Sequence, residues 1–359
     1  MKRILTITLS AVLLAAALLM LGVRSSNHGD SPAEVPAFTG TASLSATDPR
    51  PTDSLPPTQQ TTQPAATQPV TTAPTAPPTT APTEPTFLEP VFIPEEGSLL
   101  CRDYFVFDYE SNTFLTYSCD PDAVLYPASI TKLFTAYVAL QYLEPDTVIT
   151  AGDELALVAP DSSIAYIKRG HKLTASMLVE GMLLPSGNDA AYVLAAAAGR
   201  ACGGADLTAG EAIVCFVERM NAHAQALGMT GTHFANPDGY HHEDHYTTPA
   251  DMAIIARVAL EDPQIRQYVG TSQDDVVYAS GQINTWHNTN RLIDPESEYY
   301  CPDAIGLKTG STGAAGYCLL AAFDTGSRTL LIGVFGCASY NDRFVDSLNL
   351  YQWTLDMLT

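Results

Sequence analysis

The chain has 359 residues, of which 46% are apolar, so it is long enough and apolar enough to bury a sizeable core. Its 39 acidic and 17 basic residues give a formal net charge of −22, which argues against nucleic acid as a partner because such a surface repels polyanions. An anionic ligand would have to be held by a few locally placed cations.

The N-terminus has the pattern of a targeting segment. Lys2 and Arg3 precede an almost continuous apolar run from Ile4 to Val23, which is long enough to span a bilayer as a helix. The run is long for a cleaved signal, and no clear small-x-small cleavage site follows it. We therefore favour a signal-anchor in residues 1–24 over a cleaved signal peptide. The positive flank stays in the cytoplasm, so the rest of the chain is expected to be extracytoplasmic, membrane-anchored in the cell envelope or secreted if the segment is cleaved.

Residues 25–90 are rich in Thr, Pro, Ser, Ala and Gln. From Thr61 to Pro85 this segment contains no aromatic residue, no Lys and no Arg, so it cannot bury enough apolar surface to offset the entropy of ordering it. We predict a disordered linker that its prolines keep extended.

The apolar patterns of residues 91–359 predict one globular domain. Alternating apolar residues predict strands at Tyr104–Phe107, Phe114–Tyr117, Tyr317–Phe323 and Thr329–Phe335. Apolar periodicity predicts helices at Ser129–Leu143, Leu173–Leu184, Asn188–Ala198, Glu211–Leu227 and Val345–Leu358. Strands at both ends with helices between them indicate an α+β domain.

Ser129 and Lys132 are three residues apart, so on a helix they lie on one face about one turn from each other. Ser129 at the helix start would meet unpaired N–H groups, which favour developing negative charge. Apolar neighbours would desolvate Lys132 and lower its pKa, so that a neutral amine could accept the serine proton. Ser-x-x-Lys alone is a weak signal, because ordinary residue usage gives about one in a chain this long.

Two further polar motifs interrupt apolar segments. Ser186-Gly187-Asn188 lies at a predicted break between two helices, where it would present polar side chains to a cleft, or else would simply cap the second helix. Lys308-Thr309-Gly310 is predicted at the end of a strand, with a glycine that permits close approach of a ligand. The alternative for this third motif is a hairpin turn over residues 310–313.

The order Ser-x-x-Lys, Ser-x-Asn, Lys-Thr-Gly is the signature of active-site serine penicillin-recognising enzymes. The sequence resembles the low-molecular-mass penicillin-binding proteins, the serine-type D-Ala-D-Ala carboxypeptidases, from about residue 99 to residue 343. Further segments typical of that family are residues 184–189, 236–239, 245–251, 288–292 and 306–310. The resemblance implies a β-lactamase/transpeptidase-like fold, with a central antiparallel sheet flanked by helices and a helical subdomain.

The resemblance also implies the catalytic roles. Ser129 would be the nucleophile, Lys132 its base, and Ser186 a proton relay to the leaving D-alanine, although the acylation base is disputed in this superfamily. The backbone N–H groups of Ser129 and Ser311 would form the oxyanion hole. The substrate would be a peptidoglycan stem peptide ending in D-Ala-D-Ala, β-lactams would act as covalent inhibitors, and no cofactor would be needed.

Substrate binding is assigned to the two remaining motifs in the same way. Asn188 would bind the substrate amide, Lys308 would supply positive potential near the terminal carboxylate, and Thr309 would hydrogen-bond that carboxylate. Gly310 and Ser311 complete this predicted binding strand. Family members often carry a second β-rich domain and a C-terminal amphipathic anchor, and here the N-terminal segment is expected to replace that anchor.

Three other functions compete with this interpretation. Residues 241–245 are dense in His, Glu and Asp, but they lack a helical His-Glu-x-x-His arrangement, so we expect no metal site. A non-catalytic penicillin receptor would need acylation without turnover. A class A β-lactamase would need a Glu-x-x-Leu-Asn segment, and the chain's only Leu-Asn pair, at residue 348, has Val345 where the glutamate would fall.

Overall fold

A computed structural model describes residues 85–87, 89–118 and 120–358 of the chain. The chain divides into two units, residues 1–69 and 70–359, and everything described lies in the second. The predicted signal-anchor, and the predicted linker as far as residue 84, lie outside the described residues. Within the described ranges, no helix is both long enough and apolar enough to cross a membrane.

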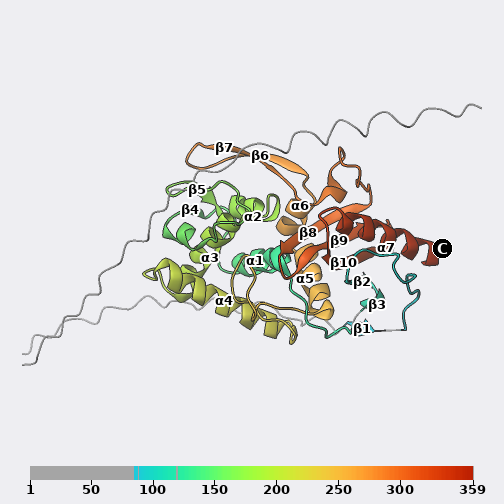
Figure 1. The fold of residues 1–359 in the computed structure, drawn as a ribbon. Helices are drawn as coiled ribbons and strands as arrows, with labels where there is room; N and C mark the ends of the chain where they lie inside the picture. Colours follow the sequence, from blue (N-terminus) through green and yellow to red (C-terminus); the bar gives the residue numbers. More distant parts are fainter. Residues whose placement is uncertain (1–84, 88, 119, 359) are drawn as a thin grey trace, which may run out of the picture. The chain divides into compact units, whose positions relative to one another are not determined.

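A six-stranded sheet is the frame of the described unit (Figure 1). Its strand order is β1-β3-β2-β10-β9-β8; the two-residue β1 runs parallel to β3, and all other neighbours are antiparallel. The central antiparallel sheet implied by the resemblance is present. In chain order the strands are β1 (Thr86–Phe87), β2 (Asp103–Asp108), β3 (Thr113–Tyr117), β8 (Ala304–Thr312), β9 (Gly316–Asp324) and β10 (Thr329–Cys337).

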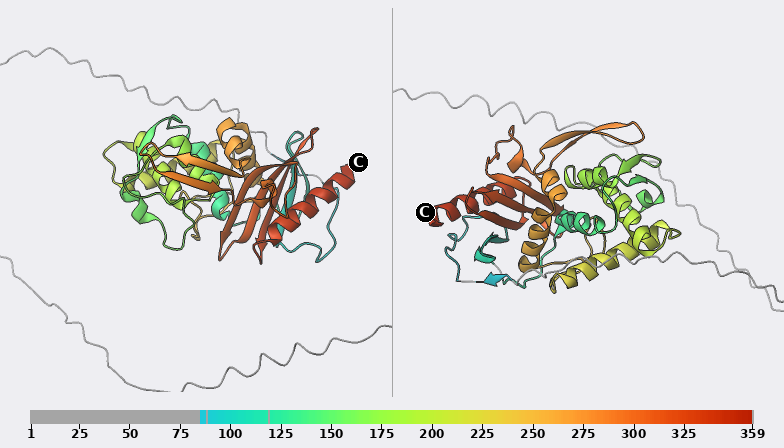
Figure 2. Two further views of the ribbon diagram at one scale, coloured as in Figure 1. Left: turned by 90° about the horizontal axis from the view of Figure 1, so that it is seen from above. Right: turned by 180° about the vertical axis from the view of Figure 1, so that it is seen from behind.

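Both faces of this sheet are covered, because successive side chains of a strand point to opposite faces. On β10, Leu331 packs into the core cluster that contains the central helices. Its neighbours Leu330 and Ile332 pack into the second cluster, which contains Phe344 of the C-terminal helix α7 (Asp342–Leu358). Figure 2 shows α7 lying along one face of the sheet.

The helices between β3 and β8 form the helical part of the unit, with α1 at its centre. Every residue of α1 except Tyr137 is buried, because this helix is apolar all round and contacts α2, α3, α4 and α5. The helices are α1 (Thr131–Ala139), α2 (Ala175–Leu183), α3 (Asn188–Gly203), α4 (Ala209–Ala226), α5 (Pro249–Glu261) and α6 (Pro263–Val269). The short elements are η1 (Ala128–Ile130), η2 (Asp153–Leu157), η3 (Arg291–Ile293), and the hairpins β4–β5 (Val148–Thr150, Lys172–Thr174) and β6–β7 (Gln273–Val277, Ile283–His287).

Two predicted boundaries were wrong. Ser129 does not open an α-helix: it lies in the 3-10 turn η1, after which α1 runs only to Ala139. The start of the helix predicted from Leu173 is strand β5, and α2 begins after Thr174, whose hydroxyl accepts a hydrogen bond from the Met177 N–H and so caps the helix. Lys308-Thr309-Gly310 lies near the end of strand β8, as predicted; the alternative of a hairpin turn over residues 310–313 is wrong, because the turn follows at residues 313–315.

The other predicted elements agree with the structure to within a few residues. These are the four strands and the helices α3, α4 and α7, each of which the sequence marked with a clear apolar period. The elements α5, α6 and the two hairpins were not predicted.

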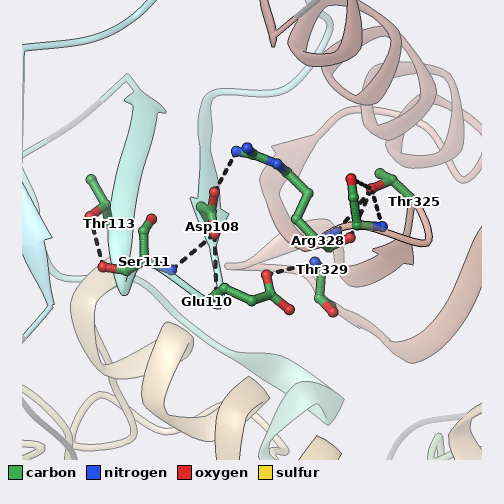
Figure 3. A network of polar contacts seen from close by, with 8 residues as sticks. Asp108, Glu110, Ser111, Thr113, Thr325, Arg328 and Thr329 are labelled. Atoms are coloured by element: carbon green, nitrogen blue, oxygen red, sulfur yellow. Dashed lines mark hydrogen bonds and ion pairs between the residues drawn. The ribbon is translucent and has the colours of Figure 1, made fainter.

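A polar network ties the β2–β3 turn to the β9–β10 turn at one edge of the sheet (Figure 3). Arg328 donates from Nη1 to Asp108 Oδ2 over 2.7 Å, and the other oxygen of Asp108 accepts from the backbone N–H groups of Glu110 and Ser111. Glu110 in turn accepts from the Thr329 N–H over 2.8 Å. These bonds join the ends of the neighbouring central strands β2 and β10.

Candidate active site

A cavity of about 490 Å³ opens where the sheet meets the helical part. Its walls come from η1, from strand β8, from the start of α7 and from three loops, residues 161–163, 186–188 and 239–241. The cavity therefore brings together all three sequence motifs, which are up to 180 residues apart along the chain. Of the predicted site residues, the cavity is lined by Ser129, Ser186, Asn188, Thr309, Gly310 and Ser311, while Lys132 and Lys308 are buried behind its wall.

Lys132 and Ser129 are in direct contact. The Nζ of Lys132 donates to Ser129 Oγ over 2.7 Å and to the backbone oxygen of Asp238 over 2.7 Å. Burial of the fully enclosed amine lowers the pKa of Lys132 to about 8, an effect that the carboxylates of Asp238 and Asp189 partly oppose. A substantial fraction of the amine is therefore neutral at mildly alkaline pH and able to accept a proton from Ser129.

Ser186 and Asn188 stand on the short connection between α2 and α3. Ser186 adopts a left-handed backbone conformation, with φ of +61°, and its carbonyl accepts from Ser163 Oγ over 2.7 Å. Asn188 Nδ2 donates to Ser162 Oγ over 2.8 Å, whereas Asn188 Oδ1 is buried and has no partner among the described residues. The helix-cap alternative holds in part: the N-cap of α3 is Gly187, which has no side-chain cap bond, but in the first turn Asp189 accepts from the Ala190 N–H over 2.9 Å.

Strand β8 carries the third motif along the opposite wall. Lys308 is fully buried, and its Nζ donates to the Thr309 carbonyl over 3.2 Å and, more weakly, to Thr289 Oγ1 over 3.5 Å. Burial, followed by repulsion from Lys132 and Arg343, lowers the pKa of Lys308 well below its usual value. A bound carboxylate would favour the charged form of Lys308 and so raise its pKa. The hydroxyls of Thr309 and Thr289 lie 2.6 Å apart at the cavity wall.

Gly310 is required by the packing of β8 against η1, and not only by approach of a ligand. A Cβ atom at Gly310 would lie 2.8 Å from the Pro127 carbonyl oxygen and 3.2 Å from the Ser129 backbone nitrogen. Gly239 approaches the same turn from the other side, where a Cβ would lie 1.9 Å from the Ala128 carbonyl oxygen. Two glycines thus allow backbone to enclose the turn that carries Ser129.

Arg343 is the main site residue that the sequence did not reveal. It lies at the start of α7 and lines the cavity, and its Nη1 donates to the carbonyls of Gly310 (3.2 Å) and Cys318 (3.4 Å). Its guanidinium also stacks over the ring of Tyr340, 4.3 Å from the ring centroid. A single arginine with no surrounding motif gives no local signal. It supplies a second cation beside the predicted carboxylate site.

The histidine-rich segment 241–245 has structural contacts of its own. His245 is buried; its Nε2 lies 2.8 Å from Thr131 Oγ1, and its Nδ1 accepts from the Ala235 N–H over 3.2 Å. Within residues 85–87, 89–118 and 120–358, no group of three or more His, Cys, Asp or Glu side chains could hold a metal ion.

The sheet, the helical part and the three motifs around one cavity define the class of penicillin-recognising serine proteins. Comparison with known families agrees. The profile of the D-alanyl-D-alanine carboxypeptidase family matches residues 91–339, so the chain belongs to that family.

Solved structures show the same fold. The crystal structure of the Streptomyces K15 DD-transpeptidase aligns with a TM-score of 0.65 and 30% identity, covering 72% of this chain and 98% of that chain. The D-alanyl-D-alanine carboxypeptidase DacD of Francisella tularensis aligns with a TM-score of 0.63 and 26% identity, covering 75% of this chain and 73% of that chain.

Curated relatives carry the same family name. D-alanyl-D-alanine carboxypeptidase DacF of Bacillus subtilis is 31% identical over 231 residues, which is 63% of this chain and 55% of the relative. D-alanyl-D-alanine carboxypeptidase DacA of Escherichia coli is 30% identical over 270 residues, which is 73% of this chain and 62% of the relative. The match thus spans less than two thirds of the length of either relative.

The contact between β8 and η1 can be tested with Gly310→Ala. The added methyl group would have to displace the Ser129 turn, because the atoms it meets are backbone. We expect acylation of Ser129 by benzylpenicillin to slow about 100-fold, as for other small misplacements of a reacting group.

Gly210→Ala is the matched control, because a Cβ there meets nothing within 4 Å. Stopped-flow measurement of acylation should give a near wild-type rate for this variant. A wild-type rate for Gly310→Ala as well would show that the close contact does not position Ser129.

Proposed function

We propose that this chain is a serine-type D-Ala-D-Ala carboxypeptidase of cell-wall peptidoglycan. It would remove the terminal D-alanine from stem peptides through an acyl-enzyme on Ser129, and β-lactams would acylate the same residue. The observation that carries the proposal is the 2.7 Å bond from Lys132 Nζ to Ser129 Oγ at the wall of the shared cavity. A nucleophile in hydrogen-bond contact with a base of lowered pKa is the arrangement that covalent catalysis requires.

The cavity also contains side chains that could bind the substrate carboxylate. Lys308 and Arg343 place two basic side chains behind and beside Thr309, in a protein whose net charge is −22. The Thr309 hydroxyl can donate to the carboxylate, and the buried Asn188 Oδ1 can accept the N–H of the substrate amide. These features support a peptide with a free C-terminal carboxylate as the ligand.

In the proposed first step, Ser129 Oγ bonds to the carbonyl carbon of the penultimate D-alanine while its proton passes to the neutral Lys132 amine. The N–H groups of Ser129 and Ser311 stabilise the resulting oxyanion. The carbon–nitrogen bond then breaks, and the proton reaches the leaving D-alanine through Ser186. Water then attacks the ester, which restores Ser129 and releases a peptide shortened by one residue.

The fate of the ester separates a carboxypeptidase from a β-lactamase. Among the described residues that line the cavity there is no glutamate, and Asp161, an acid at its rim, accepts a hydrogen bond from the Tyr240 hydroxyl. Lys132 and Ser186 therefore have to serve deacylation as well. They suit a D-alanyl ester whose leaving group has departed, whereas the tethered leaving group of a penicilloyl ester occupies the path of water.

Two substrates test the proposal: Nα,Nε-diacetyl-L-Lys-D-Ala-D-Ala and benzylpenicillin. Wild type should release one D-alanine per peptide and gain the intact mass of one penicillin, with an adduct that lasts minutes or longer. Ser129→Ala should gain no adduct and lose at least about 1,000-fold in peptide turnover, because the nucleophile is absent. Ser98→Ala, a half-buried serine distant in sequence from the motifs, is the matched control and should behave as wild type.

Three other outcomes would contradict the proposal, and two of them would indicate a different function. An adduct on Ser129→Ala would refute the assignment of the nucleophile. Rapid penicillin hydrolysis without release of D-alanine would indicate a β-lactamase, and acylation without any peptide turnover would indicate a penicillin receptor.

We also propose that residues 4–23 anchor the enzyme in the membrane, with the catalytic part in the cell envelope. The support is the length of the apolar run after Lys2 and Arg3. The full-length protein expressed in bacteria should sediment with membranes and retain its original N-terminus. A soluble product whose N-terminus lies near Ser25 would instead establish a cleaved signal.

A further inference from the structure

Asp238 is a buried carboxylate that the mechanism above does not use. It lies in the loop between α4 and α5, and its side chain is 1% exposed. Its Oδ1 accepts from the Tyr240 N–H over 3.2 Å, whereas its Oδ2 has no partner among the described residues. Burial raises the pKa of Asp238, and the nearby Lys132 opposes that rise more than any other group.

Two motif residues meet this aspartate. Lys132 Nζ donates to the backbone oxygen of Asp238 over 2.7 Å, and interaction with the Asn188 side chain lowers the pKa of the Asp238 carboxyl group. Asn188 Nδ2 donates to Ser162 Oγ over 2.8 Å, so the donor side of the amide faces Ser162. Asn188 Oδ1 is then the atom left without a partner, which is the acceptor that a substrate N–H needs.

We propose that Asp238 is a positioning residue for both motifs: its carboxylate orients the Asn188 amide toward the substrate and balances the charge of the Lys132 ammonium. The inference rests on the proposed function of the site. Asp238, a single loop residue, would then align the Ser-x-x-Lys and Ser-x-Asn motifs, which come from different helices.

Among the carboxylates that act on Lys132, Asp238 is the one with an oxygen that accepts no hydrogen bond from the described residues. Asp189 on α3 also faces Lys132, but its oxygens are occupied by the backbone N–H groups of Ala165, Ile167 and Ala190. From the loop before α5, His245 is neutral near pH 7, since burial lowers its pKa to about 3. On β8, burial and then repulsion from Lys132 and Arg343 lower the pKa of Lys308.

The charge of Asp238 changes the pKa of Lys132 in one direction. A negative carboxylate beside Lys132 favours the ammonium form and so raises its pKa. Removing that charge by Asp238→Asn lowers the Lys132 pKa further below 8. The neutral amine is then present at lower pH, so the acid limb of the acylation profile moves to lower pH.

The experiment measures acylation by benzylpenicillin and peptide turnover from pH 5 to pH 10 in wild type and Asp238→Asn. The wild-type acylation rate should reach half its plateau near pH 8. In the variant the midpoint should fall by about one pH unit, the lower end of the shift that one nearby charge produces. KM for Nα,Nε-diacetyl-L-Lys-D-Ala-D-Ala should rise several-fold, because the Asn188 amide is no longer held in one orientation.

Asp251→Asn is the control for a purely structural effect. Asp251 is also buried, and its Oδ2 accepts from the Gly231 N–H and the Thr232 hydroxyl, but it is not among the charges that act on Lys132. This variant should unfold at lower temperature and keep the wild-type pH midpoint. If Asp238→Asn fails to fold, Asp238→Ala removes the same charge without adding a new polar group.

An unchanged pH midpoint in folded Asp238→Asn or Asp238→Ala would overturn the inference, and so would an equal shift in Asp251→Asn. Failure of the proposed function looks different. In that case wild type itself releases no D-alanine from the peptide and forms no penicilloyl adduct.

Discussion

The site depends on the burial of one amine. Lys132 lies on a helix that is buried except at Tyr137, so its ammonium is shielded from water and has two hydrogen-bond acceptors, Ser129 Oγ and the Asp238 carbonyl. The same apolar residues that make α1 the centre of the core therefore set the chemistry of the serine beside it. Core packing and the activation of Ser129 have a common physical cause.

A second constraint is the close approach of backbone to the turn that holds Ser129. Gly310 and Gly239 lack the Cβ atoms that would push β8 and the 236–240 loop away from η1. Strand β8 is held at that distance by its pairing along β9 and by the sheet beyond it. In the proposed mechanism the N–H groups of Ser129 and Ser311, two residues that line the cavity, form the oxyanion hole, while Arg343 lines the same cavity and donates to the Gly310 carbonyl.

Much of this arrangement could be predicted from the sequence, because its signals are local. The buried α1, the break at residues 186–188 and the strands β9 and β10 each appear as short apolar periods or interruptions of them. The 3-10 turn at Ser129 could not be predicted, since it results from β8 and the 236–240 loop packing on it. Arg343, which lines the cavity, and Asp238, which contacts the buried Lys132, were missed as site residues for the same reason: only tertiary contacts bring them there.

The account is tested most directly by the ionisation of Lys132 itself. With ¹³C-labelled lysine, the Cε resonance of Lys132 can be followed by NMR from pH 6 to pH 11 and assigned with a Lys132→Arg variant. Burial against Ser129 predicts a midpoint near pH 8. A midpoint at the ordinary lysine value near 10.5 would contradict the account, because a permanently charged amine could not take the serine proton.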